Sequence, residues 1–249
     1  LAVALQPGAN ALPQGGVPTF GQTQVSTQGA QMTIVQGSNR AGIDWRSFSL
    51  GNGEGLNIVQ PSASSILVNR VIGTDPSVIL GNLSANGRVF LSNPRGVVFG
   101  KGSMVDVGSL VATTLNLSDA AMLAGRLDLQ AAEITPGELT QDGNIVAAGT
   151  VALVAPRLMQ SGTIQAPRIG LAAAERVSVD VEGDGLIFFN VGTSNLDVRL
   201  RQLGRLQADG GLAEIRAQAR GSFADTVLNL DGIVQARGVA SRGGRIFVD

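Results

Sequence analysis

The sequence predicts an all-β protein, a right-handed parallel β-helix with short extra-helical strands or hairpins and an N-terminal cap. A glycine followed by short aliphatic runs recurs four times in the second half. Glycine is abundant, at 34 of 249 residues, whereas aromatic residues make up only 4%. Long helical periodicity is nearly absent. Short strands of this kind cannot bury a face alone, but stacked coils bury a continuous column of Ile, Leu and Val.

The repeat consists of two apolar runs joined by a turn. Its four copies start at positions 143, 162, 204 and 232, which differ by 19, 42 and 28 residues. We interpret these steps as one rung, two rungs, and one rung with an insertion. The equivalent apolar positions are then expected to stack in one interior column: Ile145, Leu153, Ile164, Leu171, Leu206, Ile215, Val234 and Phe247.

The first half of the sequence contains the same kind of short β-branched and aliphatic runs. Strands are expected at residues 32–35, 56–59, 66–68, 78–80 and 104–107, and again at 89–91 and 97–99. The alternation around Trp45 places that ring in the core. One short helix is predicted at residues 118–124, where Ser118 or Asp119 would cap its start and Gly125 would end it.

A turn is predicted between the runs at 89–91 and 97–99. Pro94 fixes its own φ and keeps Asn93 out of the helical region. Gly96 supplies the positive φ that closes such a turn.

No segment rich in Pro, Ser or charge divides the chain, so residues 12–249 are expected to form one domain. Residues 1–11 begin with an apolar run and end in Ala9-Asn10-Ala11, which fits the small-x-small pattern of a signal-peptidase site. They are interpreted as the tail of a signal peptide or as a flexible arm. Residues 243–249 open a further rung, which predicts an N-terminal piece of a longer β-helical protein.

Composition argues against several classes of function. The formal net charge is −1 with 15% charged residues, and no basic patch suggests a nucleic-acid partner. The chain has neither His nor Cys, which excludes the usual triads, zinc sites and disulfides. Asp180, Glu182 and Asp184 resemble the start of a calcium loop, but Val191 stands at position twelve, so a polar turn is expected.

Two further candidate features remain weak. Lys101 is the only lysine and is interpreted as a solvated turn charge. Carboxylate pairs for glycoside cleavage could be assembled from Asp106, Asp128 or Asp180, but nothing in the sequence makes them adjacent. We therefore predict no catalytic residue, no metal and no cofactor.

The turn Asn93-Pro94-Arg95-Gly96 resembles the Asn-Pro-Asn-Gly signature of the filamentous-haemagglutinin-type (haemagglutination-activity) secretion domain of two-partner-secretion exoproteins. Arg95 departs from the usual asparagine. The likeness covers about residues 12 to 130, including a second motif at Asn69-Arg70. Its other segments are Leu12-Pro13-Gln14-Gly15-Gly16, Asn39, Asp44-Trp45, Ser47-Phe48, Gln60-Pro61-Ser62, Val71-Ile72-Gly73, Asp75-Pro76-Ser77, Leu83-Ser84-Ala85-Asn86-Gly87 and residues 110–116.

This resemblance implies a secretion and targeting module rather than an enzyme. Such a domain would be recognised by the periplasmic domains of a partner outer-membrane β-barrel transporter. It would pass the membrane transiently and start export and β-helix folding of a large adhesin-like protein at the cell surface or outside the cell, as a monomer. Two alternatives remain, namely a direct adhesin domain that binds a host glycan or protein, and a β-helical polysaccharide-degrading enzyme.

Overall fold

The computed structural model describes residues 11–117, 126–131, 135–180, 190–191, 198–217, 228–236 and 245–248. All regular elements in these ranges are strands, β1 to β26. The first ten residues and the helix predicted at 118–124 lie outside the described residues. In the part of the chain that is described, no helical segment has the length and hydropathy needed to span a membrane.

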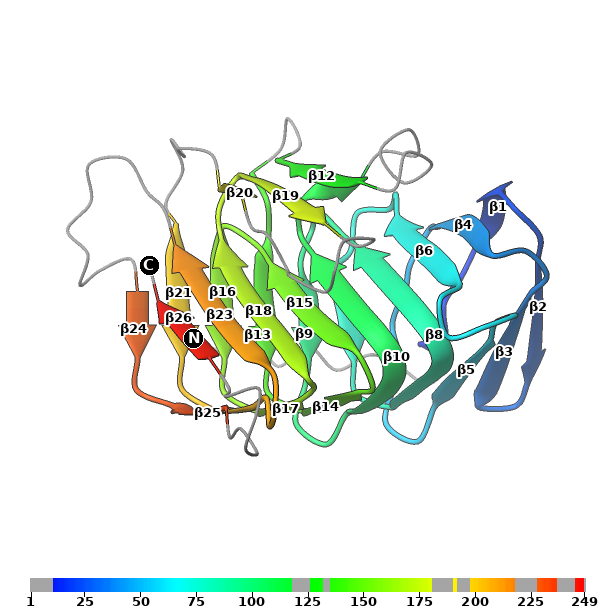
Figure 1. Ribbon diagram of the computed structural model, residues 1–249. Coiled ribbons are helices and arrows are strands. Elements are labelled where there is room, and N and C mark those ends of the chain that lie inside the picture. The colour runs from blue at the N-terminus through cyan, green and yellow to red at the C-terminus, as the bar shows by residue number, and fades with distance from the viewer. Residues whose placement is uncertain are drawn as a thin grey trace.

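The strands wind into a right-handed parallel β-helix with three faces (Figure 1). The first face contains β3 (Gln31–Gln36), β5 (Gly55–Val59), β14 (Asn144–Ala147), β17 (Thr163–Gln165), β22 (Arg205–Gln207) and β25 (Ile233–Gln235). The second contains β4 (Arg40–Trp45), β6 (Ile66–Val71), β15 (Thr150–Val154), β18 (Arg168–Ala173), β23 (Leu212–Ala217) and β26 (Arg245–Val248). The long strands β8 (Asn82–Ser92) and β10 (Met104–Thr113) run through both faces, so the predicted fold is confirmed.

The third face is a separate six-stranded parallel sheet. Its strands are β7 (Ser77–Ile79), β9 (Val97–Phe99), β13 (Glu138–Gln141), β16 (Arg157–Gln160), β21 (Arg199–Gln202) and β24 (Leu228–Leu230). The predicted strands of the first half therefore all fall in observed strands, with 78–80 displaced by one residue.

The interior column follows the predicted stacking. On the first face Ile145 lies opposite Ile164, and Ile164 lies opposite Leu206. On the second face Leu153 lies opposite Leu171, which lies opposite Ile215. All six side chains are fully buried in one apolar cluster, and Val234 is partly buried against it. The alternation of inward and outward residues along each strand is sufficient to identify these positions, because successive side chains of a strand point to opposite faces.

Two details of the predicted repeat are wrong. Val248, not Phe247, is the Cα partner of Ile215, so the last copy is out of register by one residue. The 42-residue step from β17 to β22 is a single rung, because these strands pair directly. The extra residues leave the coil for strands β19 (Arg176–Asp180) and β20 (Asn190–Val191) of another sheet. A long insertion costs little more loop-closure entropy than a short one. The number of residues between two repeat copies therefore does not give the number of rungs between them.

That other sheet lies on the outside of the second face (Figure 1). It is antiparallel and also contains β11 (Asn116–Leu117) and β12 (Arg126–Gln130). A second apolar cluster, separate from the interior column, joins Leu117, Leu129 and Val177 of this sheet to outward residues such as Phe90 and Val111. The predicted extra-helical strands are therefore present, and they bury the outer face of the coil.

The N-terminal end of the coil is covered by two antiparallel strands. β1 (Val17–Phe20) pairs with β4, and β2 (Thr23–Gln28) forms a hairpin with β3. Gly29 closes the hairpin turn with a φ of 58°, which glycine adopts without strain. This is the predicted cap.

A ladder of three buried glutamines, which was not predicted from the sequence, stands at one corner of the coil. Gln160 Nε2 donates to Gln141 Oε1 at 3.0 Å, and Gln202 Nε2 donates to Gln160 Oε1 at 3.2 Å. Each side-chain amide also donates to the carbonyl two residues on, as Gln141 does to Gly143 at 2.6 Å. The ladder could have been predicted from the Gln-x-Gly motif, which recurs at residues 141–143, 160–162 and 202–204.

Candidate functional site

The turn at residues 93–96 carries the chain from β8 on the second face to β9 on the third. The Gly96 amide donates to the Asn93 carbonyl at 3.0 Å, which closes the turn. The Arg95 amide donates to Asn93 Oδ1 at 2.9 Å, so the asparagine side chain imitates a backbone turn. The predicted turn is therefore present.

The Asn93 side chain is fully buried and reaches the preceding rung. Its Nδ2 donates to the Asp75 carbonyl and to Ser77 Oγ, both at 3.0 Å. The Asn93 amide donates to the Thr113 carbonyl of the following rung at 3.0 Å. Asn93 thus joins three consecutive coils, and no apolar side chain could make the bonds of its Nδ2 to Asp75 and Ser77.

Gly96 and Pro94 extend the same connections. Gly96 has a φ of 131°, a value that residues with a Cβ rarely adopt. An added Cβ would lie 3.3 Å from the Glu138 carbonyl oxygen and 3.4 Å from Pro76 Cβ. The Pro94 carbonyl accepts a hydrogen bond from the Gly137 amide at 2.8 Å. The turn is therefore packed between the rung before it and the rung after it.

Arg95 is the exposed member of the turn. The one hydrogen bond described for it within the turn comes from its backbone amide. The hydrogen bonds described within the turn therefore do not use the side chain at this position.

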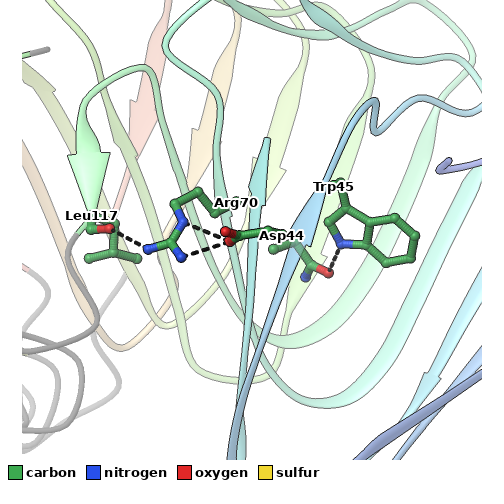
Figure 2. A network of polar contacts seen from close by, with 5 residues as sticks. Asp44, Trp45, Arg70 and Leu117 are labelled. Carbon is green, nitrogen blue, oxygen red and sulfur yellow. Dashed lines mark hydrogen bonds and ion pairs between the residues drawn. The ribbon is translucent and has the colours of Figure 1, made fainter. Parts of the chain in front are cut away.

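The second motif lies directly beside the first. Asn69 and Arg70 on β6 are the Cα partners of Leu91 and Ser92 on β8, immediately before the turn. Asn69 points inward and is fully buried, and its Oδ1 accepts the Trp45 indole N–H at 3.0 Å (Figure 2). Trp45 is 2% exposed, so its predicted place in the core is confirmed.

Arg70 points outward to the extra-helical segment (Figure 2). Its Nε and Nη2 both lie 2.7 Å from Asp44 Oδ1, and its Nη1 donates to the Leu117 carbonyl at 3.3 Å. Next to it, Ser92 Oγ donates to the Leu115 carbonyl at 2.8 Å. The two outward side chains therefore hold the start of the extra-helical sheet against the coil. The sequence did not reveal this role, because the contacts join positions up to 47 residues apart.

The weaker candidates do not assemble into a site among the described residues. Asp106 lies opposite Ser84 and Val146, not opposite another carboxylate. Asp128 is the Cα partner of Ser178. Lys101 is exposed in its turn, as expected. The calcium-loop candidate at 180–185 lies outside the described residues apart from Asp180, of which only the strand position is described. No group of three or more carboxylates that could hold a metal occurs in the described ranges.

The chain is thus a parallel β-helix in which the two sequence motifs lie side by side on neighbouring rungs. The family model of the TPS secretion domain matches residues 9–249, so the chain belongs to that family, the secretion modules of two-partner-secretion exoproteins. The resemblance inferred from residues 12 to 130 is therefore confirmed.

Two curated relatives are much longer than the segment that matches this chain. A heme/hemopexin-binding protein of Haemophilus influenzae strain Rd is 36% identical over 144 residues, which is 57% of this chain and 16% of that protein. Another protein of the same name from Haemophilus influenzae is 42% identical over 106 residues, or 42% of this chain and 11% of the relative. The chain therefore matches only a small part of these relatives' length.

Solved structures with low sequence identity show the same fold. The HMW1 secretion domain from Haemophilus influenzae has a TM-score of 0.81 at 23% identity, over 94% of this chain and 62% of that one. The filamentous hemagglutinin secretion domain has a TM-score of 0.55 at 19% identity, over 94% and 99% of the two chains.

Proposed function

We propose that this domain is recognised by the periplasmic domains of a partner outer-membrane β-barrel transporter and starts export and β-helix folding of a larger adhesin-like protein. The family match over residues 9–249 carries this proposal. In this proposal residues 12–249 act as a single monomeric domain. It passes through the periplasm to the cell surface or the medium, and it binds neither nucleic acid nor a cofactor and catalyses no reaction.

The connections of the 93–96 turn support a role in folding. Asn93 bonds to the rung on either side of it, and Gly137 of the next third-face rung bonds to the turn. These bonds exist only when neighbouring coils are in register. Parallel pairing of distant segments folds slowly, so a turn that fixes the register of several coils provides a starting point for the others. The proposed site consists of Asn93, Pro94, Arg95 and Gly96, together with Asn69 and Arg70.

The repetitive architecture is suited to templating. Each rung of the coil pairs in parallel with its neighbours, and each added rung buries its neighbour's apolar face. A folded domain of this kind can therefore serve as a template for further rungs of a passenger.

Export from cells that carry a candidate partner barrel tests the proposal, and the candidate to choose is a barrel with periplasmic domains, if one is encoded beside the gene of this chain. We expect Asn93→Ala and Gly96→Val to block export, whereas the matched variant Arg95→Asn in the same turn is exported normally. Binding of each denatured variant to the isolated periplasmic domains separates recognition from folding. Normal export of Gly96→Val would refute the role of the turn, and export of the unaltered chain without any barrel would refute the transporter proposal.

A further inference from the structure

The pair Asn-Gly occurs twice in the chain, at Asn52-Gly53 and at Asn86-Gly87. This pair is chemically labile, because glycine has no Cβ to hinder attack of its amide nitrogen on the preceding asparagine side chain. Both asparagines are exposed, so neither the local sequence nor exposure distinguishes the two pairs. Their hydrogen bonds do distinguish them.

Asn86 is held by the neighbouring rung. Its Oδ1 accepts the Gln60 amide at 2.7 Å, and its Nδ2 donates to the Gln60 carbonyl at 2.8 Å. The following Gly87 is buried, and a Cβ added to it would lie 2.6 Å from Gln60 Oε1. Both ends of the Asn86 carboxamide are therefore bonded, and the side chain cannot turn onto the Gly87 nitrogen unless both bonds break.

Asn52 lies in an open turn. The turn precedes β5 and is closed by the Glu54 amide, which donates to the Gly51 carbonyl at 3.1 Å. Gly53 has a φ of 80°, and a Cβ added to it would have no atom within 4 Å. Neither the Asn52 side chain nor the Gly53 amide makes a hydrogen bond to a described residue. The side chain and the nitrogen can therefore approach each other without breaking such a bond.

We propose that Asn52 is a site of spontaneous deamidation, with water as the co-reactant. The Gly53 nitrogen loses its proton to a base in the solvent and bonds to the side-chain carbonyl carbon of Asn52, which closes a succinimide ring. The Cγ–Nδ2 bond breaks, and the nitrogen takes up a proton from water and leaves as ammonia. Water then adds to either carbonyl of the ring, which opens to aspartate or isoaspartate at position 52.

The product forms beside a buried carboxylate that anchors the N-terminal segment, residues 11–16. Glu54 is 6% exposed, and its Oε1 accepts the Ala11 amide at 2.9 Å while its Oε2 accepts the Gly51 amide at 2.6 Å. Isoaspartate adds a carbon atom to the backbone of this closed turn, and both products add a negative charge two residues from Glu54. Deamidation therefore weakens the bond from Glu54 to Ala11 and loosens residues 11–16. This inference does not depend on the secretion role.

Peptide mass spectrometry of the purified, folded chain, kept in mildly alkaline buffer, tests the site. We expect Asn52 to be converted about tenfold faster than Asn86, because two hydrogen bonds must break before Asn86 reacts. In the chain unfolded in urea the two should react at similar rates, since both are followed by glycine. Equal rates in the folded chain, faster conversion of Asn86, or a tenfold difference that persists in urea would overturn the proposal.

Hydrogen exchange of the deamidated chain tests the consequence. The Ala11 amide and the Gln14 amide, which donates to the Ser47 carbonyl at 2.9 Å, should exchange several-fold faster than before incubation. The control Asn52→Gln keeps the carboxamide but closes the corresponding ring much less readily, so the same incubation should leave its exchange unchanged. Unchanged exchange over residues 11–16 in the deamidated chain, or an equal change in Asn52→Gln, would refute the link to the N-terminal segment.

Discussion

The Trp45 indole N–H donates to Asn69 Oδ1 at 3.0 Å inside the coil, across two neighbouring rungs. The same asparagine donates through Nδ2 to the Phe90 carbonyl on the next rung at 3.4 Å. Its neighbour Arg70 points outward and bonds to Asp44 and to the carbonyl of Leu117. One dipeptide therefore links the core of three coils to the extra-helical sheet.

Removal of the Asn69 amide is expected to destabilise the domain. In Asn69→Ala, the buried Trp45 N–H loses its acceptor, and an unpaired buried donor costs about 1–3 kcal/mol. Urea unfolding followed by Trp45 fluorescence, the only tryptophan of the chain, measures the change. Asn144→Ala, at an exposed strand position, is the control and should change the unfolding midpoint little. Equal stability of Asn69→Ala and the unaltered chain would show that water replaces the acceptor.

The turn at 93–96 is expected to tolerate change only at its exposed position. Gly96→Ala should cost about 1–3 kcal/mol, because alanine must adopt a φ of 131°. Asn93→Ala should cost a similar amount, because Ser77 Oγ and the Arg95 amide lose their partner. Arg95→Asn should be within about 0.5 kcal/mol of the unaltered chain. Chemical denaturation measures all three, and a loss in Arg95→Asn as large as in Asn93→Ala would contradict this account of the turn.

A charge in the interior column is expected to damage one rung first. Ile164→Asp buries an unpaired carboxylate among aliphatic side chains, which costs several kcal/mol. That is a large part of the ~5–15 kcal/mol typical of a domain. Because a solenoid is stabilised by neighbouring rungs, hydrogen exchange should show lost protection first at residues 143–172.

The matched control for this substitution is Gln165→Asp, at the exposed next position of the same strand. It should leave protection nearly unchanged. Uniform loss over the whole chain in Ile164→Asp would argue against independent neighbouring-rung interfaces. Unchanged protection would mean that the buried position of Ile164 is incorrect.

Substitution of the middle glutamine of the ladder is expected to lower the stability of the domain more than substitution of the last one. Gln160→Leu breaks two glutamine–glutamine bonds, whereas Gln202→Leu breaks one. Gln202 Oε1 already has no hydrogen-bond partner among the described residues. The residue opposite Gln202 on the next strand is Leu230, which offers no side-chain amide. With each neutral bond contributing about 1 kcal/mol, Gln160→Leu should be the less stable variant by about that amount. Differential scanning calorimetry of the two leucine variants provides the comparison, and the reverse order would contradict the ladder.

The sequence alone was sufficient to predict the β-helix, its repeat and most strand positions. It also placed Ile145, Ile164 and Leu206 in one column, because the alternation of side chains along a strand is a local property. The Asn93-Pro94-x-Gly96 turn could be predicted for the same reason, since Pro94 and Gly96 restrict their own backbone.

Contacts between rungs were decided only by the tertiary structure. The bond from Trp45 to Asn69, the contact of Arg70 with Leu117 and the strand pairing of Arg157 with Arg199 join residues that are 24 to 47 positions apart. The pairing of strands depends on where an insertion leaves the β-helix and where the chain returns to it. The step of 42 residues, which is a single rung, is an example. Because the entropy of closing a loop rises only slowly with its length, local sequence does not determine that pairing. The packing of neighbouring coils against one another determines it.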